Sequence, residues 1–129
     1  MAGVLYTKTH EWVKVKGDVA TIGLTDYAQG ELGDIVFVEM PEVGTELSTG
    51  DSVGTIESVK TVSDYYSPVT GEIIEVNDNL EDAPETINED PSGEGWIYRV
   101  KLEDKDELED LMDESDYKQY LKKLQEEEE

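Results

Sequence analysis

The stretch ESVKTVSDYYSPVTG, residues 57–71, contains a single lysine, Lys60, in a segment that otherwise carries no positive charge. Across residues 17–98 no other Lys or Arg occurs, although Asp and Glu are plentiful there. An exposed lysine on a strand is common, and an ion pair with Glu57 or Asp64 would add little stability if exposed. The isolation favours another explanation, in which the amine is acylated and becomes a neutral amide. Lys60 is therefore a candidate attachment site.

The same region decides the fold prediction. Residues 53–67, VGTIESVKTVSDYYS, read by local rules as one strand, because no Gly or Asn-Gly interrupts Ile56–Ser67. Strands usually span about 3 to 10 residues, so we expect a break inside this segment. No local signal marks the position of that break.

Further short strands are predicted on both sides of this segment, because apolar runs alternate with Gly, Pro and Asp. In the third of them, Ile35, Phe37 and Met40 are expected on one face, and Pro41 ends the strand. The predicted strands are HEWVKV (10–15), VATIGL (19–24), DIVFVEM (34–40), GEIIEVN (71–77) and WIYRV (96–100).

Helices are predicted at two places. TDYAQGELGD (25–34) suits a short helix, with Thr25 as N-cap and Gly33 as its stop. A polar loop follows GEIIEVN, with a turn of helix near Pro84. After Lys101 the spacing becomes helical, and two apolar stripes are expected to pack on the sheet, with Ser115 capping the second helix. These stripes are Leu108, Leu111 and Met112, then Tyr117, Tyr120, Leu121 and Leu124.

Length and charge set limits on the class of protein. The 129 residues suit one domain, predicted over 1–125, with an acidic frayed tail over 126–129. The formal net charge of −23 comes from 33 acidic and 10 basic residues, and it disfavours nucleic acid and anionic membrane partners. The acidic excess has two explanations, solvation in a salty cytoplasm or steering toward basic partner surfaces.

Enzymatic motifs are mostly absent. The chain has no cysteine, so neither a disulfide nor a thiolate metal site is possible. HEWVK lacks the second histidine of a zinc motif, and NEDPSG (88–93) lacks the closing Glu of a calcium loop, since Arg99 stands there. No signal peptide or apolar run of about 18 residues is seen, which predicts a cytoplasmic protein.

Five segments together resemble the glycine cleavage system H proteins, a lipoyl carrier family. They are HEWV, TDYAQ, GDIVFVE, ESVK and the GEGW loop, and the similarity extends over almost the whole chain. The resemblance implies a mainly β fold, a lipoyl/biotinyl-type β-sandwich (barrel-sandwich hybrid) with a short internal helix and C-terminal helices. It places the lysine at an exposed hairpin tip.

The resemblance also implies a cofactor and residues that serve its attachment. Lys60 would carry lipoate in amide linkage. Glu57, Gly44 and Gly71 match family positions that help the attaching lipoate ligase or lipoyl transferase to recognise the tip. Two features depart from the family: Thr61 replaces a more usual Ala, and DYYSP (64–68) is bulkier than the common form. Neither touches the attachment chemistry, but both bear on partner affinity.

In function, the resemblance implies a monomeric, non-catalytic carrier. Glycine decarboxylase (P protein) would load an aminomethyl group, and the aminomethyltransferase (T protein) would remove it. Dihydrolipoyl dehydrogenase (L protein) would then reoxidise the lipoyl group. Three alternatives stay open: a carrier for another lipoyl or biotinyl complex, a relay of lipoyl groups, and an unmodified acidic interaction module.

A loaded arm would need shelter, because its amine is cationic near neutral pH and is lost to hydrolysis in water. Carboxylates are natural receptors for such a group. The family match points to Glu11, which is the only acid before Asp18, and to Asp64, four residues after Lys60. Thr9 could add a hydroxyl acceptor. The plain alternative is that these acids only solvate the surface.

Overall fold

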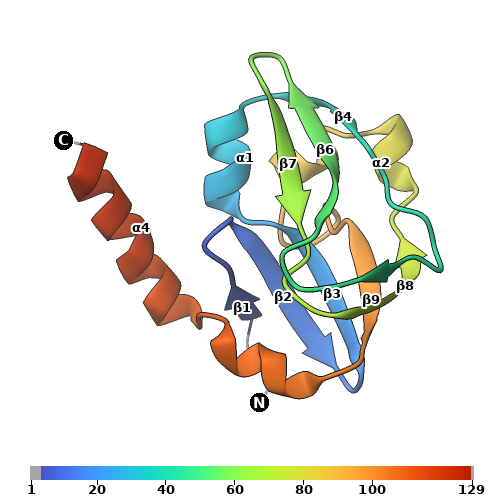
Figure 1. The fold of residues 1–129 in the computed structure, drawn as a ribbon. Helices are drawn as coiled ribbons and strands as arrows, with labels where there is room; N and C mark the ends of the chain where they lie inside the picture. The colour runs from blue at the N-terminus through green and yellow to red at the C-terminus, as the bar shows by residue number, and fades with distance from the viewer. Residues whose placement is uncertain (1–3, 129) are drawn as a thin grey trace.

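The computed structural model describes residues 4–128, which form two antiparallel sheets and several short helices (Figure 1). The larger sheet has six strands, and its order is β1 (Val4–Tyr6), β2 (Glu11–Lys16), β3 (Val19–Leu24), β9 (Tyr98–Leu102), β8 (Gly71–Val76) and β5 (Glu46–Leu47). The smaller sheet has the order β4 (Ile35–Val38), β6 (Ser52–Ser58) and β7 (Val62–Tyr66). This arrangement confirms the predicted β-sandwich with an internal helix.

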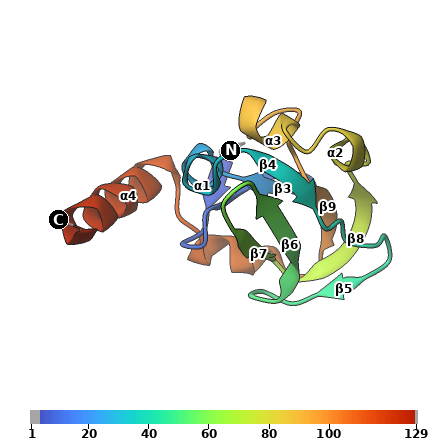
Figure 2. The ribbon, with the colours of Figure 1, turned by 90° about the horizontal axis from the view of Figure 1, so that it is seen from above.

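The hydrophobic core draws side chains from both sheets. The larger sheet supplies Val13, Ile22 and Val100, and the smaller one supplies Ile56 and Tyr65, all nearly or fully buried. Seen from above, the smaller sheet lies across the larger one, with β5 and β8 closing one side (Figure 2). Burial of alternate residues explains why short strands with mixed polarity suffice for this fold.

The β4 strand corrects one prediction. Ile35 and Val38 are buried, whereas Phe37 is half exposed, because the pairing of β4 with β6 shifts register between Ile35 and Phe37. Such a bulge places one extra residue on a strand and reverses the alternation after it. Ile35 and Phe37 therefore do not share a face.

The predicted break in the long central segment is confirmed. β6 ends at Ser58 and β7 begins at Val62, and the two pair as a hairpin from Ser52↔Tyr66 to Glu57↔Val62. In Figure 1 this hairpin is the green pair that rises above the rest of the molecule. Its tip lies beside the C-terminal end of α1 (Asp26–Leu32), which begins at the predicted N-cap Thr25 and ends at Gly33.

The polar segment after β8 contains more helix than one turn. Two short helices, α2 (Asn79–Asp82) and α3 (Thr86–Glu89), flank Pro84 and bury Leu80 and Ile87 completely. These two apolar side chains give the polar segment its anchor in the core.

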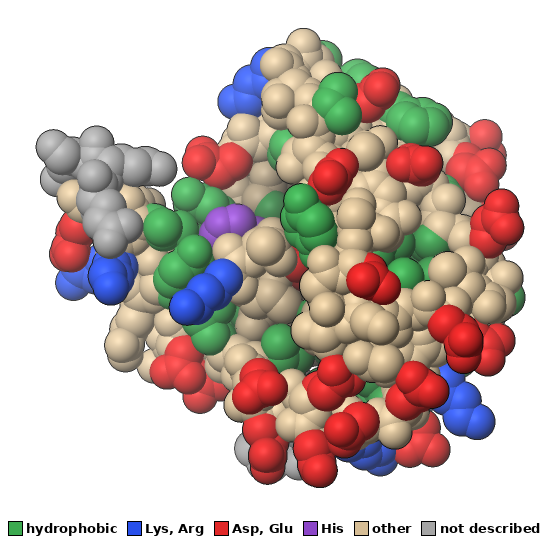
Figure 3. Space-filling model, in the orientation of Figure 1, with side chains coloured by type: hydrophobic (Ala, Val, Ile, Leu, Met, Phe, Trp, Pro, Cys, Tyr) green, Lys and Arg blue, Asp and Glu red, His purple; other side chains and the backbone are tan. Residues whose placement is uncertain are grey.

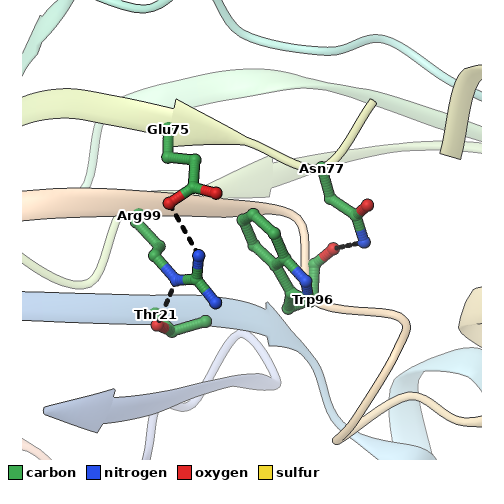
Figure 4. Close-up of polar contacts among 5 residues, drawn as sticks. All are labelled: Thr21, Glu75, Asn77, Trp96 and Arg99. Atoms are coloured by element: carbon green, nitrogen blue, oxygen red, sulfur yellow. Dashed lines mark hydrogen bonds and ion pairs between the residues drawn. The ribbon is translucent and has the colours of Figure 1, made fainter. Parts of the chain in front are cut away.

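The GEGW loop is fastened to the larger sheet at Trp96 (Figure 4). The guanidinium of Arg99 lies 4.0 Å from the Trp96 ring centroid, and its Nη1 lies 2.7 Å from Glu75 Oε1. Its Nε donates to Thr21 Oγ1 at 3.0 Å, and Asn77 Nδ2 donates to the Trp96 carbonyl at 2.7 Å. These contacts tie β3, β8 and β9 together at the loop.

The C-terminal region differs from the predicted helix pair. Lys105–Asp110 form a 3-10 helix, η1, and only α4 (Glu114–Glu128) is an α-helix. Ser115 lies inside α4 and does not cap it; the cap is Asp113, whose Oδ1 accepts from Asp116 N at 2.8 Å. The predicted tail is helical through Glu128, and Glu129 lies outside the described residues.

Two kinds of feature are absent from the part of the chain that the structure describes. No described helix is long and apolar enough to cross a membrane. Residues 4–128 also contain no cluster of His, Asp or Glu arranged to hold a metal ion.

Candidate attachment site and adjoining cleft

Lys60 lies at the middle of the three-residue tip between β6 and β7 and is exposed. The tip is closed by a bond from Ser58 N to the Thr61 carbonyl at 2.8 Å. The Ser58 hydroxyl accepts from Lys60 N at 3.3 Å and from Thr61 N at 3.1 Å. The backbone of the tip is therefore held by Ser58, while the lysine side chain is left to solvent.

The tip is also tied to the turn after α1. Val59 N donates to the Asp34 carbonyl at 2.9 Å. The stem of Lys60 lies over Gly33, where an added Cβ would be 3.4 Å from Lys60 Cε. Among the described residues no carboxylate pairs with Lys60, so the ion pair with Glu57 or Asp64 is not formed. Lys60 does not line the cleft beside α1, but Gly33, over which its stem lies, directly follows Leu32, which does line it.

The surface around the tip is apolar and acidic. Phe37, Glu57 and Val62 are cross-strand neighbours on β4, β6 and β7, and all three are exposed. Val59, at the tip itself, is 69% exposed. Figure 3 shows hydrophobic and acidic side chains mixed at the end of the molecule that carries the hairpin. Exposed apolar groups gathered beside a reactive amine mark a surface that another protein can cover.

A cleft of about 230 Å³ runs between α1, β7 and the loop before β2. Both Glu11 and Asp64 line it, and so does Thr9, so the structure brings the three predicted shelter residues together. The remaining lining residues are His10, Leu24, Tyr27, Ala28, Glu31, Leu32, Ile56, Ser63 and Tyr65. Apolar walls with carboxylates suit a long alkyl arm that ends in a cation.

Glu11 is the most unusual residue of this cleft, being only 2% exposed. Its Oε1 accepts from Thr7 Oγ1 at 2.7 Å and from the Thr9 hydroxyl, and its Oε2 accepts from Tyr66 N at 3.3 Å. Burial raises the pKa of the Glu11 carboxyl, and these hydrogen bonds oppose that rise. A buried carboxylate without a cationic partner is costly, which suggests that it is kept for a ligand.

Asp64 and Thr9 differ from Glu11 in exposure. Asp64 is exposed on β7, opposite Thr55. Thr9 is also exposed, and its hydroxyl is already used by Glu11 and lies 3.1 Å from Thr7 Oγ1. The main role of the Thr9 hydroxyl in this structure is therefore to orient the Glu11 carboxylate. Asp64 adds a solvent-exposed carboxylate to the lining of the cleft.

Gly44 and Gly71 lie outside the hairpin tip: Gly44 is in the turn before β5, and Gly71 is the first residue of β8. Gly44 has φ +95° and its N–H donates to the Ile73 carbonyl at 2.7 Å. A Cβ at Gly71 would lie 2.1 Å from the Lys101 carbonyl oxygen, so this position needs glycine for strand packing. The structure thus supplies a structural reason for both glycines, and their role in recognition stays a prediction.

The sequence reasoning missed Thr7 and the use of Gly33 as a seat for the lysine. Thr7 carried no local signal, because Thr7 and Thr9 meet Glu11 through the turn between β1 and β2, in which His10 N donates to the Thr7 carbonyl. Gly33 carried no local signal either, because a glycine that ends a helix does not indicate which distant side chain, here Lys60, will pack on it.

Comparisons with known proteins show the family to which the chain belongs. The family described as Glycine cleavage H-protein matches residues 4–124. The chain belongs to the glycine cleavage H-protein family. Its fold is similar to the crystal structure of a glycine cleavage system H protein from Mycobacterium marinum, with a TM-score of 0.83 and 41% identity over 91% of this chain and 94% of that one.

Relatives in the glycine cleavage H-protein family cover nearly the full chain. The glycine cleavage system H protein of Rubrobacter xylanophilus is 56% identical over 97% of this chain and 94% of its own length. That of Thermotoga maritima is 52% identical over 89% of this chain and 93% of its own. Membership at this identity supports the role of lipoyl carrier in the glycine cleavage system, as a carrier subunit that interacts with the other components of that system.

Proposed function

We propose that Lys60 carries lipoate in amide linkage and that the chain uses this arm to shuttle the aminomethyl group of glycine. The group would pass from glycine decarboxylase to the aminomethyltransferase, and dihydrolipoyl dehydrogenase would then restore the oxidised arm. The observation that carries the proposal is the exposed Lys60, whose amine forms no ion pair among the described residues. Its stem lies over Gly33, next to Leu32 of the cleft that the buried carboxylate of Glu11 also lines.

The residues present fit a lipoyl-lysine arm. The seat at Gly33 leaves room for the lysine stem, and Ala28 and Leu32 give the cleft an apolar side. A lipoyl group supplies a disulfide that accepts the carbon fragment, and the chain holds no cysteine that could compete for it. The tether raises the effective concentration of cargo at each partner site.

Glu11 and Asp64 are proposed to receive the cationic amine of the cargo. Glu11 is oriented before any arm arrives, because Thr7, Thr9 and the backbone of Tyr66 already donate to it. An ammonium placed beside Oε2 would gain a charge-assisted bond and would remove the cost of the buried charge. The chain itself then performs no catalysis: it binds, orients and excludes water.

Modification of Lys60 is proposed to depend on a lipoate ligase or lipoyl transferase that covers the tip. Such an enzyme must reach the amine, and the exposed row of Phe37, Glu57 and Val62 lies next to it. A basic group on the enzyme facing Glu57, among apolar contacts, would complement this surface.

The test is the intact mass of the full chain after incubation with lipoate, ATP and a lipoate ligase. One lipoyl group is expected on the wild type, at Lys60 by peptide mapping, and none on Lys60→Arg with the same circular dichroism spectrum. A group found on another lysine, or a wild type that stays unmodified, would reject the proposal in favour of an unmodified acidic interaction module.

A further inference from the structure

A tyrosine of the C-terminal helix joins the two sides of the cleft. The hydroxyl of Tyr117, on α4, lies 2.8 Å from His10 Nδ1 and 2.8 Å from Thr25 Oγ1. Its ring is stacked on Tyr6 with centroids 4.7 Å apart and an interplanar angle of 4°. Tyr117 is 5% exposed, so both hydrogen bonds lie out of bulk water.

The first of these bonds reaches the loop that carries Glu11. His10 lies between Thr9 and Glu11, and it has φ +71°, the one positive value among the described residues other than glycine. A side chain in this left-handed region costs about 1 kcal/mol or more, so the surrounding contacts must hold it there. His10 N donates to the Thr7 carbonyl at 3.1 Å, and Tyr117 holds the imidazole.

The second bond reaches the start of α1. The Thr25 hydroxyl accepts from Ala28 N at 3.2 Å as the N-cap of this helix, and Thr25 N donates to the His10 carbonyl at 3.0 Å. The helix that follows contributes Tyr27, Ala28, Glu31 and Leu32 to the cleft. Tyr117 is thus bonded to a residue at the base of each wall.

We propose that Tyr117 is a positioning residue for the arm cleft, fixing the Thr9–Glu11 loop relative to α1 from outside the cleft. This inference rests on the proposed function, because it concerns the shelter of the aminomethyl cargo. Tyr117 does not line the cleft and touches no cargo. Its hydroxyl bonds to His10 on one wall and to Thr25 at the start of the other. The C-terminal helix thereby helps to fix the shape of the cleft that would hold the aminomethyl cargo.

The chain offers a matched control on the same helix. Tyr120 also lies near His10, with ring centroids 6.1 Å apart, and its hydroxyl donates to the Lys8 carbonyl at 3.5 Å. Among the described residues this hydroxyl bonds to neither Thr25 nor the imidazole, so Tyr120→Phe removes a hydroxyl from α4 without breaking the side-chain link between the walls. Tyr117→Phe removes the side-chain link between His10 and Thr25, leaves the backbone bond from Thr25 N to the His10 carbonyl, and keeps the ring on Tyr6.

Two measurements test the proposal. His10 is the only histidine, so the ¹H–¹⁵N signals of its imidazole can be assigned without ambiguity. In the unmodified full chain they report the hydrogen bonding of this residue of the cleft wall. These signals are expected to shift in Tyr117→Phe and to show altered tautomer populations, with a smaller change in Tyr120→Phe. In the lipoylated chain, release of the loaded aminomethyl group without transferase should become about fivefold faster in Tyr117→Phe, the scale of one lost hydrogen bond.

Three results separate the possibilities. An imidazole signal unchanged by Tyr117→Phe, or a release rate within twofold of that of Tyr120→Phe, would overturn the proposal. If Tyr117→Phe does not fold, Thr25→Val breaks the link from the other wall, but it also removes the N-cap of α1. It therefore supports the proposal only if the imidazole signals of His10 shift along with the faster release, and unchanged signals overturn it. Failure of the wild type to accept lipoate would reject the proposed function, whereas the imidazole measurement would still decide whether Tyr117 positions His10.

Discussion

The stem of Lys60 lies against Gly33, close enough that a Cβ at residue 33 would be 3.4 Å from Lys60 Cε. The hairpin tip and the end of α1 are thereby joined, and the bond from Val59 N to the Asp34 carbonyl holds them together. The lysine that would carry the arm thus lies beside the end of α1, whose Leu32 lines the cleft. This contact places the proposed attachment site next to the helix that forms one wall of the cleft.

Gly33→Ala is expected to lower the free energy of unfolding by about 1 to 3 kcal/mol, because Gly33 has φ +80° and ψ −157°. Gly30, within the same helix, is the matched control, since a Cβ there meets no atom within 4 Å and its φ is not positive. Gly30→Ala should stabilise the chain by about 1 kcal/mol. Urea unfolding of both variants measures the difference, and equal effects would contradict the role given to residue 33.

Glu57→Lys is expected to slow lipoylation of Lys60 severalfold while changing stability by about 0.5 kcal/mol or less, because Glu57 is exposed. A reversed charge beside the amine would repel the basic group expected on the attaching enzyme. Initial rates by mass spectrometry test this, with Glu72→Lys, an exposed position on β8, as control. Indistinguishable rates for the two variants would remove Glu57 from recognition.

Glu11→Gln is expected to stabilise the chain at pH 7 by less than about 1 kcal/mol. It removes a buried charge and keeps an acceptor for Thr7 and Thr9, but its NH₂ group replaces the oxygen that accepts from Tyr66 N. The pKa of Glu11 is raised by burial, so the penalty in the wild type grows as the pH rises above 4.5. The stabilisation of Glu11→Gln relative to the wild type should therefore vanish at pH 4 and below, where the Glu11 carboxyl is mostly protonated in both the folded and the unfolded chain. Thermal unfolding across pH 3 to 8 measures it.

The same variant should release the aminomethyl cargo faster than the wild type, since a neutral amide is a poorer receptor for an ammonium. Asp64→Asn provides a comparison at the exposed edge of the cleft. We expect the larger effect at Glu11. Three equal release rates would mean that neither carboxylate shelters the arm.

Stability is expected to fall as the pH drops below 6.5 because of His10. Burial lowers the pKa of this imidazole, and the charge of Glu31 opposes the shift; Tyr27, Tyr117 and Tyr120 also face the ring. Between the folded pKa and 6.5, His10 is therefore protonated in the unfolded chain but neutral in the folded chain. The free energy of unfolding decreases as the pH falls through this range and levels off below the folded pKa. His10→Asn tolerates the positive φ and should show no such loss between pH 6.5 and 5.5.

Several elements were predictable because their signals are local. Thr25 and Gly33 bound α1 as their capping chemistry requires, and alternation marked β2 and β3. Phe37 was placed on the wrong face because a bulge depends on pairing with β6, which no local pattern encodes. Ser115 was taken for a cap because serine favours that position, but Asp113 makes the bond.

The amino-acid order alone determined most strand segments, the short helix and the isolation of Lys60, because backbone preferences and charge are properties of neighbouring residues. It did not indicate β1 or β5, which are short strands at the two edges of the larger sheet. Only the tertiary structure decided that the stem of Lys60 lies over Gly33 and that Glu11 is a buried residue lining the cleft. It also decided that Tyr117, about a hundred residues downstream, holds His10. Burial and hydrogen bonding between distant segments depend on how sheets pack, and packing is a property of the whole chain.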